Sequence, residues 1–573
     1  MSTSLPKLKH SQNILWLIAL SLVMFLPGLS SLPVIDRDEA RFAQASVQMA
    51  ESGDMINIRF QDEARNKKPA GAYWAQTAFI KAFSTPGERH IWAQRMPSVL
   101  AGLIAIIATY WAGVAMIGRR GAVIAASFLA ISILMVFEAH VAKTDALLCA
   151  AGTLVFTSLA FLRQDTKRRY AILFWTALAI AVMIKGPVIP AITILTLISL
   201  AVWERDNDTN TQHWMKRLLF WPGPILFLLL VLPWTIMIYQ ETNGQFFIDA
   251  IAGDFGSKLV GAQEKHGAPP GAYIATLSIA FWPASLLLFP GLAFAFRAVI
   301  RNKTDQTSIV RAMRLALAWV LPYWIVLEIV PTKLPNYLLP VYPALAVMCG
   351  GAMLVLFSVP HFKYARRIGA ILFFIVSLTL AAGLPIAEAS YGGNPSWSYA
   401  MSGLAMLVSL CAAYALWTAR AKMVFVCTVL SGIILVTPTF GFLLPSMTDF
   451  RLAERVEQAF TNAGKSLPRH GGPSVLAPNF TEPSLVYHLG KRIVLGDKID
   501  LSVTLTPGTM IVMNTQRDDI KPFRESLRAA GNCIQDVDQV EGYNYSKGKA
   551  VVLQLSEVIT CPPKISLEEP NTL

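Results

Sequence analysis

Charged residues are scarce in this chain. Of its 573 residues, 15% are charged and 54% are hydrophobic, whereas roughly a quarter of the residues of an average soluble protein are charged. The deficit argues against several water-soluble domains and predicts a chain largely buried in lipid. The net charge of +13 comes mainly from basic residues in short loops between apolar stretches. Because that distribution is the one that orients membrane proteins, we expect no nucleic-acid partner.

Cysteine is also rare. The six cysteines include no CxxC pair, which argues against a zinc site or a disulfide framework. Cys533 and Cys561 can pair if the C-terminal region lies in an oxidising compartment. No internal repeat or low-complexity linker is present. The other cysteines, all within apolar stretches, are Cys149, Cys349, Cys411 and Cys427.

Apolar stretches long enough to cross a bilayer, about 20 residues each, recur along residues 1–445. The first is longer than the apolar core of a signal peptide, so we interpret it as a retained membrane span. The sequence therefore predicts an all-α polytopic membrane protein with about thirteen transmembrane helices. The stretches are 13–32, 97–117, 121–138, 145–162, 170–184, 187–203, 218–239, 272–296, 315–331, 337–358, 368–386, 399–418 and 423–445.

The loops between these stretches alternate in charge. By the positive-inside rule the basic set is cytoplasmic, the other set faces outward, and an odd number of spans leaves the C-terminus outside. The basic set includes Arg119, Arg120, Arg163, Lys216, Arg217, Arg297, Arg314, Lys363, Arg366 and Arg367. The expected outer segments are 36–95, 138–145, 185–187, 241–271, 331–337 and 387–397.

After Pro445 the apolar runs shorten, so residues 446–573 are predicted to form a small α/β domain on the outer side. Helix is expected over 521–530. The expected strands are 484–487, 492–495, 510–513 and 550–555.

The first outer segment is dense in ionisable residues, especially over 34–74. Such residues at a membrane surface are costly unless used, so the stretch predicts a reaction or binding site centred on Asp38. On a helix Asp38 and Glu39 point about 100° apart, so one can act as a general base while the other orients a neighbour. The pair can equally serve as a helix cap. Arg41 is spaced to pair with Asp38 on one helix face.

Two amphipathic helices, over 39–51 and 70–83, are expected within the juxtamembrane region 36–90. We expect them to lie in the membrane interface with their polar faces toward a cavity. The alternative is that they only cap the helix bundle.

Single cations recur in the outer segments, where positive-inside sorting should deplete them. An anionic partner explains their presence, and a lipid phosphate at the membrane surface would provide one. The alternative is snorkelling to headgroups, which fits Lys185 and Lys333 less well because proline or glycine surrounds each of them. The cations are Lys67, Lys68, Arg95, Lys185, Lys258, Lys265 and Lys333.

Three further residues are candidates for substrate binding. Asp145 opens an apolar stretch and can bind substrate or cap a helix. Tyr337 follows Lys333 at a spacing that puts both on one helix face. Asp254 shares a loop with Glu264 and His266. Because these three lack close metal-ligand spacing, a divalent metal is left open, no ligands are assigned and no cofactor is expected with certainty.

With these residues in view, the chain resembles the bacterial lipid A aminoarabinose transferase family, ArnT-like members of the protein-mannosyltransferase-like (GT-C) glycosyltransferase superfamily. The resemblance is good over about residues 36–343. The last spans resemble the family only in hydropathy, and the C-terminal domain only in its position in the chain. Its motifs are RDEARFA (37–43), NKKPAGAYW (66–74), the Asp145 loop, KGP (185–187), HGAPP (266–270), FWP (281–283) and KLPNYLLPVYP (333–343).

The resemblance implies an enzyme that takes a sugar from a polyprenyl-phosphate carrier and passes it, with inversion, to an acceptor at the periplasmic face of the bacterial inner membrane. Asp38 would be the base or its close partner, and Tyr337 a hydrogen-bond donor to the carrier phosphate. A fixed cation stabilises the charge that develops on that leaving group. The cations that would hold the phosphate are Lys68, Lys185, Lys258 and Lys333.

Two departures from the family pattern affect the expected substrate. Where the family has phenylalanine-glutamate-lysine-proline, this chain has Asn66-Lys67-Lys68-Pro69, so a base replaces an acid. A family glutamate-histidine pair appears here as Asp254-Phe255, and an arginine as Lys258. The lost acid and histidine put a zinc site in doubt, and the added lysine suits a uronic acid such as galacturonic acid better than aminoarabinose.

The leading hypothesis is therefore a glycosyltransferase acting on lipid A or lipopolysaccharide core, with a protein hydroxyl as the alternative acceptor. A lipid or sugar transporter is the rival of another class. Transporters usually place polar groups near the bilayer midplane and often show repeat symmetry. Here the charges lie at the expected outer rim and no repeat is found, which favours the enzyme.

Overall fold

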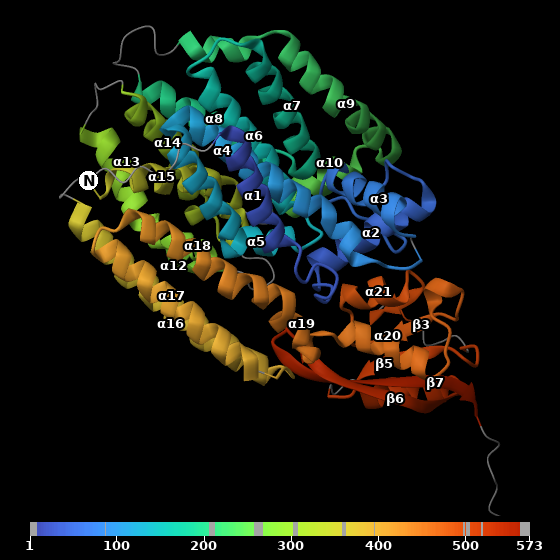
Figure 1. The fold of residues 1–573 in the computed structure, drawn as a ribbon. Coiled ribbons are helices and arrows are strands. Elements are labelled where there is room, and N and C mark those ends of the chain that lie inside the picture. Colours follow the sequence, from blue (N-terminus) through green and yellow to red (C-terminus); the bar gives the residue numbers. More distant parts are fainter. Residues whose placement is uncertain are drawn as a thin grey trace, which may run out of the picture.

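The protein is a bundle of long helices joined to a small C-terminal sheet domain at one end (Figure 1). In the computed structural model, residues 9–85, 87–204, 213–256, 267–301, 307–357, 362–394, 396–496, 499, 505–516 and 520–561 are described. The boundary expected near residue 445 coincides with the end of the last apolar helices.

The bundle helices match the apolar stretches. Within the described ranges, eight helices are long and apolar enough to cross a membrane, and three apolar helices are shorter. All thirteen expected stretches fall on helices, and the predicted polytopic α-helical fold is confirmed. The bundle helices are α1 (His10–Phe25), α4 (Ile91–Ile131), α5 (Ile133–Ala139), α6 (Asp145–Leu162), α7 (Arg168–Lys185), α8 (Val188–Trp203), α9 (Pro222–Thr242), α12 (Ala272–Ala280), α13 (Leu288–Arg301), α14 (Ser308–Ile329), α15 (Tyr342–Val355), α16 (Lys363–Ser390), α17 (Ser396–Trp417), α18 (Ala421–Pro438) and α19 (Leu444–Ser446).

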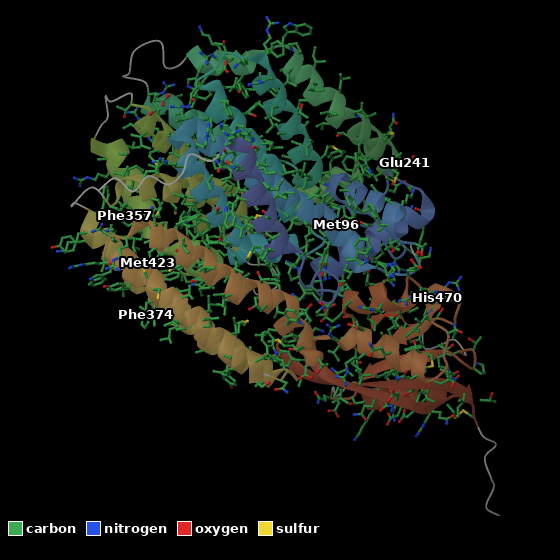
Figure 2. All side chains as sticks on the ribbon, viewed as in Figure 1. Met96, Glu241, Phe357, Phe374, Met423 and His470 are labelled. Carbon is green, nitrogen blue, oxygen red and sulfur yellow. A yellow bond between two sulfur atoms is a disulfide. The ribbon has the colours of Figure 1, made fainter. Side chains whose placement is uncertain are left out.

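Helix α4 combines two expected stretches. Its backbone breaks at Gly118, where φ is 79° and ψ is 168°, and a positive φ is a conformation that glycine adopts without steric cost. The bundle surface is apolar, as lipid contact requires. Figure 2 shows one such side chain, Phe374 of α16, which is 37% exposed.

Short helical segments connect the bundle helices to one another and to the C-terminal domain. They are η1 (His213–Leu219), α10 (Gln245–Ile248), the π-helix η2 (Asp249–Gly256), η4 (Ala284–Leu287), η5 (Pro335–Val341), η7 (Thr439–Leu443) and η8 (Thr448–Phe450).

The two expected juxtamembrane helices are present as α2 (Asp38–Ser52) and α3 (Gly71–Phe83). They pack through stacked rings of Phe42 and Tyr73, whose centroids are 4.8 Å apart. Ser46 Oγ also donates to Gln76 Oε1 at 2.7 Å in this buried contact. An unexpected antiparallel hairpin of β1 (Arg59–Phe60) and β2 (Glu63–Ala64) lies between the two helices in the sequence.

The C-terminal domain is built on a five-stranded mixed sheet in the order β4-β3-β5-β7-β6. Strand β3 pairs in parallel with β4 and β5, while β7 pairs antiparallel with β5 and β6. The expected α/β character is confirmed. The elements are α20 (Leu452–Asn462), η9 (Pro468–His470), β3 (Val475–Ala477), α21 (Pro483–Leu489), β4 (Ile493–Leu495), β5 (Met510–Asn514), α22 (Ile520–Ala529), β6 (Asn532–Asn544) and β7 (Lys549–Thr560).

One expected strand of this domain is wrong. Residues 484–487 lie within helix α21, which begins at Pro483. Proline at the first helical position has a preset φ and no amide hydrogen to leave unpaired, so it favours a helix start. The short apolar run was too brief for its periodicity to distinguish strand from buried helix.

The expected outer segments meet at one end of the bundle. Ala142 donates its amide to Glu39 of α2 at 2.9 Å, and Asn66 donates to Asp249 of η2 at 2.9 Å. Between α16 and α17, Tyr391 packs against Tyr543 of the C-terminal domain, with ring centroids 4.9 Å apart. The juxtamembrane helices and the C-terminal domain therefore share this end (Figure 1).

Candidate active site

Two carboxylates and two lysines meet at this end, and we call them the carboxylate–lysine cluster: Glu138, Lys143, Asp145 and Lys185. Lys185 Nζ lies 2.6 Å from Asp145 Oδ1, and Lys143 Nζ lies 3.2 Å from Glu138 Oε1 and 3.9 Å from Asp145 Oδ2. Asp145 begins α6 and Lys185 ends α7, the helix ends where an acid and a base are respectively favoured. The structure therefore brings together two residues that the sequence analysis predicted for the site, Asp145 and Lys185.

The KLPNY segment reaches the same cluster. Lys185 Nζ lies 5.5 Å from the ring centroid of Tyr337, and the Asn336 side chain hydrogen-bonds to Asp145. Tyr323 Oη donates to the carbonyl of Tyr337 at 3.1 Å, which fixes the backbone there. Residues from three separate parts of the chain, the segment 138–145, Lys185 and Asn336, thus meet at Asp145.

Lys143 stays a cation in this setting. Burial alone would lower its pKa, but the carboxylates of Glu138, Asp145 and Asp38 outweigh burial and raise the pKa above its usual value. Asp38 is exposed at the first position of α2. Asp38 adjoins Glu39, whose carboxylate accepts the amide of Ala142, the residue before Lys143, so the exposed Asp38 lies close to the cluster.

Glu39 occupies a different environment from Asp38. Glu39 and Arg95 are both fully buried, and their side chains form a double ion pair with N–O distances of 2.8 and 2.9 Å. Glu39 also accepts the amides of Ile35 and Ala142. Arg95 donates to three carbonyls, those of Leu29, Leu32 and Pro33. The geometry therefore favours a positioning role for both residues over contact with a substrate.

Lys333 binds the end of the helix that precedes it. Its Nζ donates to the carbonyl of Val330 at 2.7 Å and to that of Glu328 at 3.0 Å, at the C-terminus of α14. Tyr337, four residues later, lies at the cluster. The segment from Lys333 to Tyr337 therefore reaches the site, while the Lys333 amine is bonded to backbone carbonyls.

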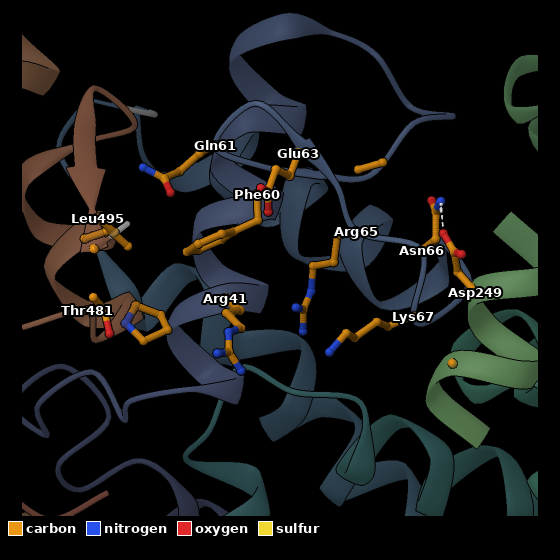
Figure 3. A pocket seen from close by; sticks show the side chains of 14 residues that line it. Arg41, Phe60, Gln61, Glu63, Arg65, Asn66, Lys67, Asp249, Thr481 and Leu495 are labelled. Atoms are coloured by element: carbon orange, nitrogen blue, oxygen red, sulfur yellow. Dashed lines mark hydrogen bonds between the residues drawn. The ribbon is translucent and has the colours of Figure 1, made fainter. Parts of the chain in front are cut away.

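Arg41 and Lys67 line a second, adjoining feature, a pocket of about 780 Å³ (Figure 3). Arg41 comes from α2, one turn after Asp38, and Lys67 from the turn between β2 and α3. Lys68 is half-buried in the same turn, directly before Pro69. Sequence reasoning assigned these three residues to substrate binding but did not divide them between two sites.

Some residues predicted for the site are not among those that the structure describes. Lys258 and Lys265 fall outside the described residues, as do Glu264 and His266. The backbone of Asp254 is part of η2, while its side chain is not described. Over the described ranges, no group of three or more His, Cys, Asp or Glu side chains could hold a metal ion.

Several site residues were missed from the sequence. Lys143 directly precedes Thr144 and Asp145, and Arg65 opens the basic run before Pro69, so local charge could have identified both. Glu138 and Asn336 carried no such signal, because their role depends on contact with residues distant in the sequence.

The chain is similar to several known proteins. A family model described as dolichyl-phosphate-mannose-protein mannosyltransferase matches residues 67–237. The undecaprenyl phosphate-α-4-amino-4-deoxy-L-arabinose arabinosyl transferase of Edwardsiella ictaluri is 25% identical over 66% of this chain and 66% of its own. The Yersinia pestis protein of the same name is 25% identical over 60% of this chain and 59% of its own. The aligned part thus spans about two thirds or less of these relatives.

The fold likeness extends further than the sequence likeness. ArnT from Cupriavidus metallidurans, in a crystal structure bound to undecaprenyl phosphate, superposes with a TM-score of 0.74 over 95% of this chain and 98% of its own, at 19% identity. The Archaeoglobus fulgidus oligosaccharyltransferase superposes with a TM-score of 0.52 over 98% of this chain and 75% of its own, at 11% identity. In sequence the chain is similar to these arabinosyl transferases, and it shares the fold of ArnT from Cupriavidus metallidurans.

Proposed function

We propose that this chain is an inner-membrane glycosyltransferase that moves a sugar, with inversion, from a polyprenyl-phosphate carrier to lipid A or lipopolysaccharide core at the periplasmic face. The observation that carries the proposal is the carboxylate–lysine cluster beside the exposed Asp38, at the end of the bundle shared with the C-terminal domain. The names of the relatives and of the ArnT complex support a polyprenyl-phosphate donor.

In this reaction the acceptor hydroxyl attacks the anomeric carbon of the sugar from the side opposite the carrier phosphate. The bond from that carbon to the phosphate oxygen breaks, and the electron pair leaves with the carrier. Asp38 takes the hydroxyl proton as general base. Tyr337 donates a hydrogen bond, and cations stabilise the charge that grows on the leaving phosphate. We assign this role to Lys68, Lys185 and Lys333, and add Lys143 from the geometry. Lys258, which lies outside the described residues, is assigned from the resemblance alone.

Lys185 is held by Asp145 and Lys143 by Glu138, so both ammonium groups are placed before a substrate binds. Preorganised charges are the more effective kind, because they need no rearrangement as the reaction proceeds. Glu39 and Arg95 position the start of α2, and thereby Asp38.

An apolar pocket of about 830 Å³ fits the lipid part of the carrier. Its walls come from α12, α13, α14 and α16, and it reaches Glu328, whose carbonyl accepts from Lys333. Isoprenoid chains bind to such apolar walls by burial of their methyl and methylene groups. Lys333 then stands where the phosphate end of the carrier would emerge, and releasing its amine from the carbonyls would let it bind that phosphate.

Two observations support a periplasmic site. The basic loops lie at the end of the bundle away from the cluster, where Arg163 pairs with Glu204 and Arg311 donates to the carbonyl of Arg163. Cys533 and Cys561 form a disulfide in the C-terminal domain, and disulfides form in oxidising compartments such as the periplasm.

The sugar is aminoarabinose or a uronic acid such as galacturonic acid, and Lys67 in place of an acid favours the latter. A protein hydroxyl is the second candidate acceptor, because the matching family model is described as a protein mannosyltransferase.

Mass spectrometry of lipid A, lipopolysaccharide core and envelope proteins from cells with and without this chain tests the proposal. A mass difference of one sugar on lipid A or core is the expected result and names the donor sugar. A difference confined to protein would support the second acceptor. Identical masses in all three fractions would overturn the proposal.

A further inference from the structure

The pocket that contains Arg41 and Lys67 is built by two domains. Arg41 comes from α2, and the segment that follows β1 supplies a second wall (Figure 3). The C-terminal domain supplies a third wall, from the loop before α21 and the end of β4. The residues of that wall are Thr481, Pro483, Leu495 and Gly496.

Three cations point into one part of this pocket. Figure 3 shows the side-chain ends of Arg41, Arg65 and Lys67 directed toward a common region, with the Glu63 carboxylate beside Phe60 and Asp249 at the side of the view. Three positive side chains that share one region attract an anion more strongly than a single one would. Guanidinium groups bind carboxylate and phosphate through paired hydrogen bonds.

Arg65 is held rigidly in that arrangement. It is 8% exposed, its Nε donates to Tyr73 Oη at 3.1 Å, and its guanidinium lies 5.2 Å from the Phe42 ring centroid. Asp249 is held at the pocket edge by Asn66 and Gln245, at 2.9 and 2.7 Å.

The hairpin before Arg65 is clamped between the two domains. Phe60 packs against the apolar core of the C-terminal domain. The Gln61 side chain donates to the carbonyl of Ile493 at 2.5 Å, while its backbone amide and carbonyl bond to Gln48 of α2 at 2.9 and 2.8 Å. The C-terminal domain therefore both walls the pocket and fixes the segment that carries two of its cations.

We propose that this pocket is an anion-binding subsite, completed by the C-terminal domain, which takes a carboxylate or phosphate group on one of the two substrates. The inference rests on the proposed transferase function. Arg41 lies one helical turn from Asp38, so an anion bound here would lie close to the reacting groups. The anion is either the carboxylate of a uronic acid on the carrier or a phosphate of the acceptor lipid.

Binding to the full-length protein in detergent tests the subsite without requiring catalysis. Native mass spectrometry would compare a polyprenyl phosphate carrying galacturonate with one carrying galactose, and diphosphoryl lipid A with dephosphorylated lipid A. Lys67→Glu is expected to weaken the binding of one charged ligand about tenfold or more. The binding of its uncharged counterpart should change by no more than about twofold. Loss confined to the galacturonate pair assigns the donor, and loss confined to the lipid A pair assigns the acceptor. The control is Lys81→Glu, on the exposed surface of α3.

The wall is tested separately. Thr481→Trp fills the pocket from the side of the C-terminal domain and is expected to weaken the binding of the same ligand. The control is Thr461→Trp, which is exposed on α20 and lies outside the pocket.

Two outcomes separate the subsite from the transferase. Charge-selective binding that depends on Lys67, in a protein that transfers no sugar, would keep the subsite and overturn the transferase. Transfer that keeps its full preference for the charged substrate in both Lys67→Glu and Arg41→Gln would overturn the subsite and keep the transferase.

Discussion

Asp38 and Glu39 are adjacent in the sequence but differ completely in surroundings. Asp38 is exposed beside Lys143, whereas Glu39 is enclosed with Arg95. A helix turns by about 100° per residue, so neighbouring side chains face different environments. The open carboxylate is the one that a substrate can reach.

Asp38→Asn keeps the size of the side chain but removes the base. We expect kcat for sugar transfer to fall by about 10²–10⁴-fold, with binding of the polyprenyl phosphate retained. A transfer assay with the purified protein and a carrier-binding measurement check this. Asp62→Asn, exposed in the hairpin turn, should have no effect; full activity in Asp38→Asn would remove Asp38 as the base.

Asp36 predicts a pH dependence at the contact between domains. Its Oδ1 accepts the amide of Ser484 at 2.9 Å, and its own amide donates to Tyr545 Oη. Burial, together with the Glu482 carboxylate, raises the pKa of Asp36 to about 7, against the opposing effects of Ser484 and Arg37. Because the folded pKa exceeds the unfolded one, the folded state binds the proton more tightly, and stability falls as pH rises from about 4 to 7.

Asp36→Asn keeps an acceptor oxygen for Ser484 and cannot ionise. We expect this variant to be more stable than the native chain near pH 7, with an advantage that grows by at most about 1.4 kcal/mol per pH unit between pH 4 and 7. Thermal unfolding in detergent across that range measures it. An advantage independent of pH would show that Asp36 does not titrate there.

At the scale of elements, the Glu39–Arg95 pair joins α2, α4, the loop after α1 and the loop before α6. Breaking one partner leaves a buried charge unpaired, which typically costs about 3–5 kcal/mol. Removing both leaves no such charge. We therefore expect Glu39→Leu with Arg95→Leu to destabilise the protein by less than the sum of the single substitutions.

Thermal unfolding of the two single variants and the double variant measures this coupling. Additive losses would mean that the ion pair contributes nothing beyond its separate hydrogen bonds. The pair Arg451 and Glu454, which lies in the C-terminal domain and is partly exposed, is the comparison, because exposed pairs contribute about 1 kcal/mol or less.

At the scale of the whole molecule, the proposed orientation in the membrane is argued from the basic end and the disulfide. A membrane-impermeant maleimide should label Thr461→Cys in cells with a permeabilised outer membrane. Lys167→Cys, in the expected cytoplasmic loop between α6 and α7, should react only after lysis. The reverse pattern would place the cluster and the C-terminal domain in the cytoplasm and contradict the periplasmic assignment.

The sequence alone was sufficient for the helix bundle, because a backbone in lipid must satisfy its hydrogen bonds within each helix, so apolar length decides the spans locally. It also predicted Asp38, Asp145, Lys185 and Tyr337 as site residues, since ionisable or polar residues at span ends are conspicuous in an apolar chain, and the last three lie together in the structure. In the C-terminal domain it was weaker, as the misassigned strand at 484–487 shows, because short apolar runs carry no clear periodicity.

Only the tertiary structure decided which charges pair. Lys185 binds Asp145 across 40 residues and Arg95 binds Glu39 across 56, while sequence spacing reveals only partners three or four residues apart. A buried charge must be matched by whichever opposite charge folding brings within reach. The sharing of a cationic pocket between α2 and the C-terminal domain has the same origin, because it depends on how two domains dock.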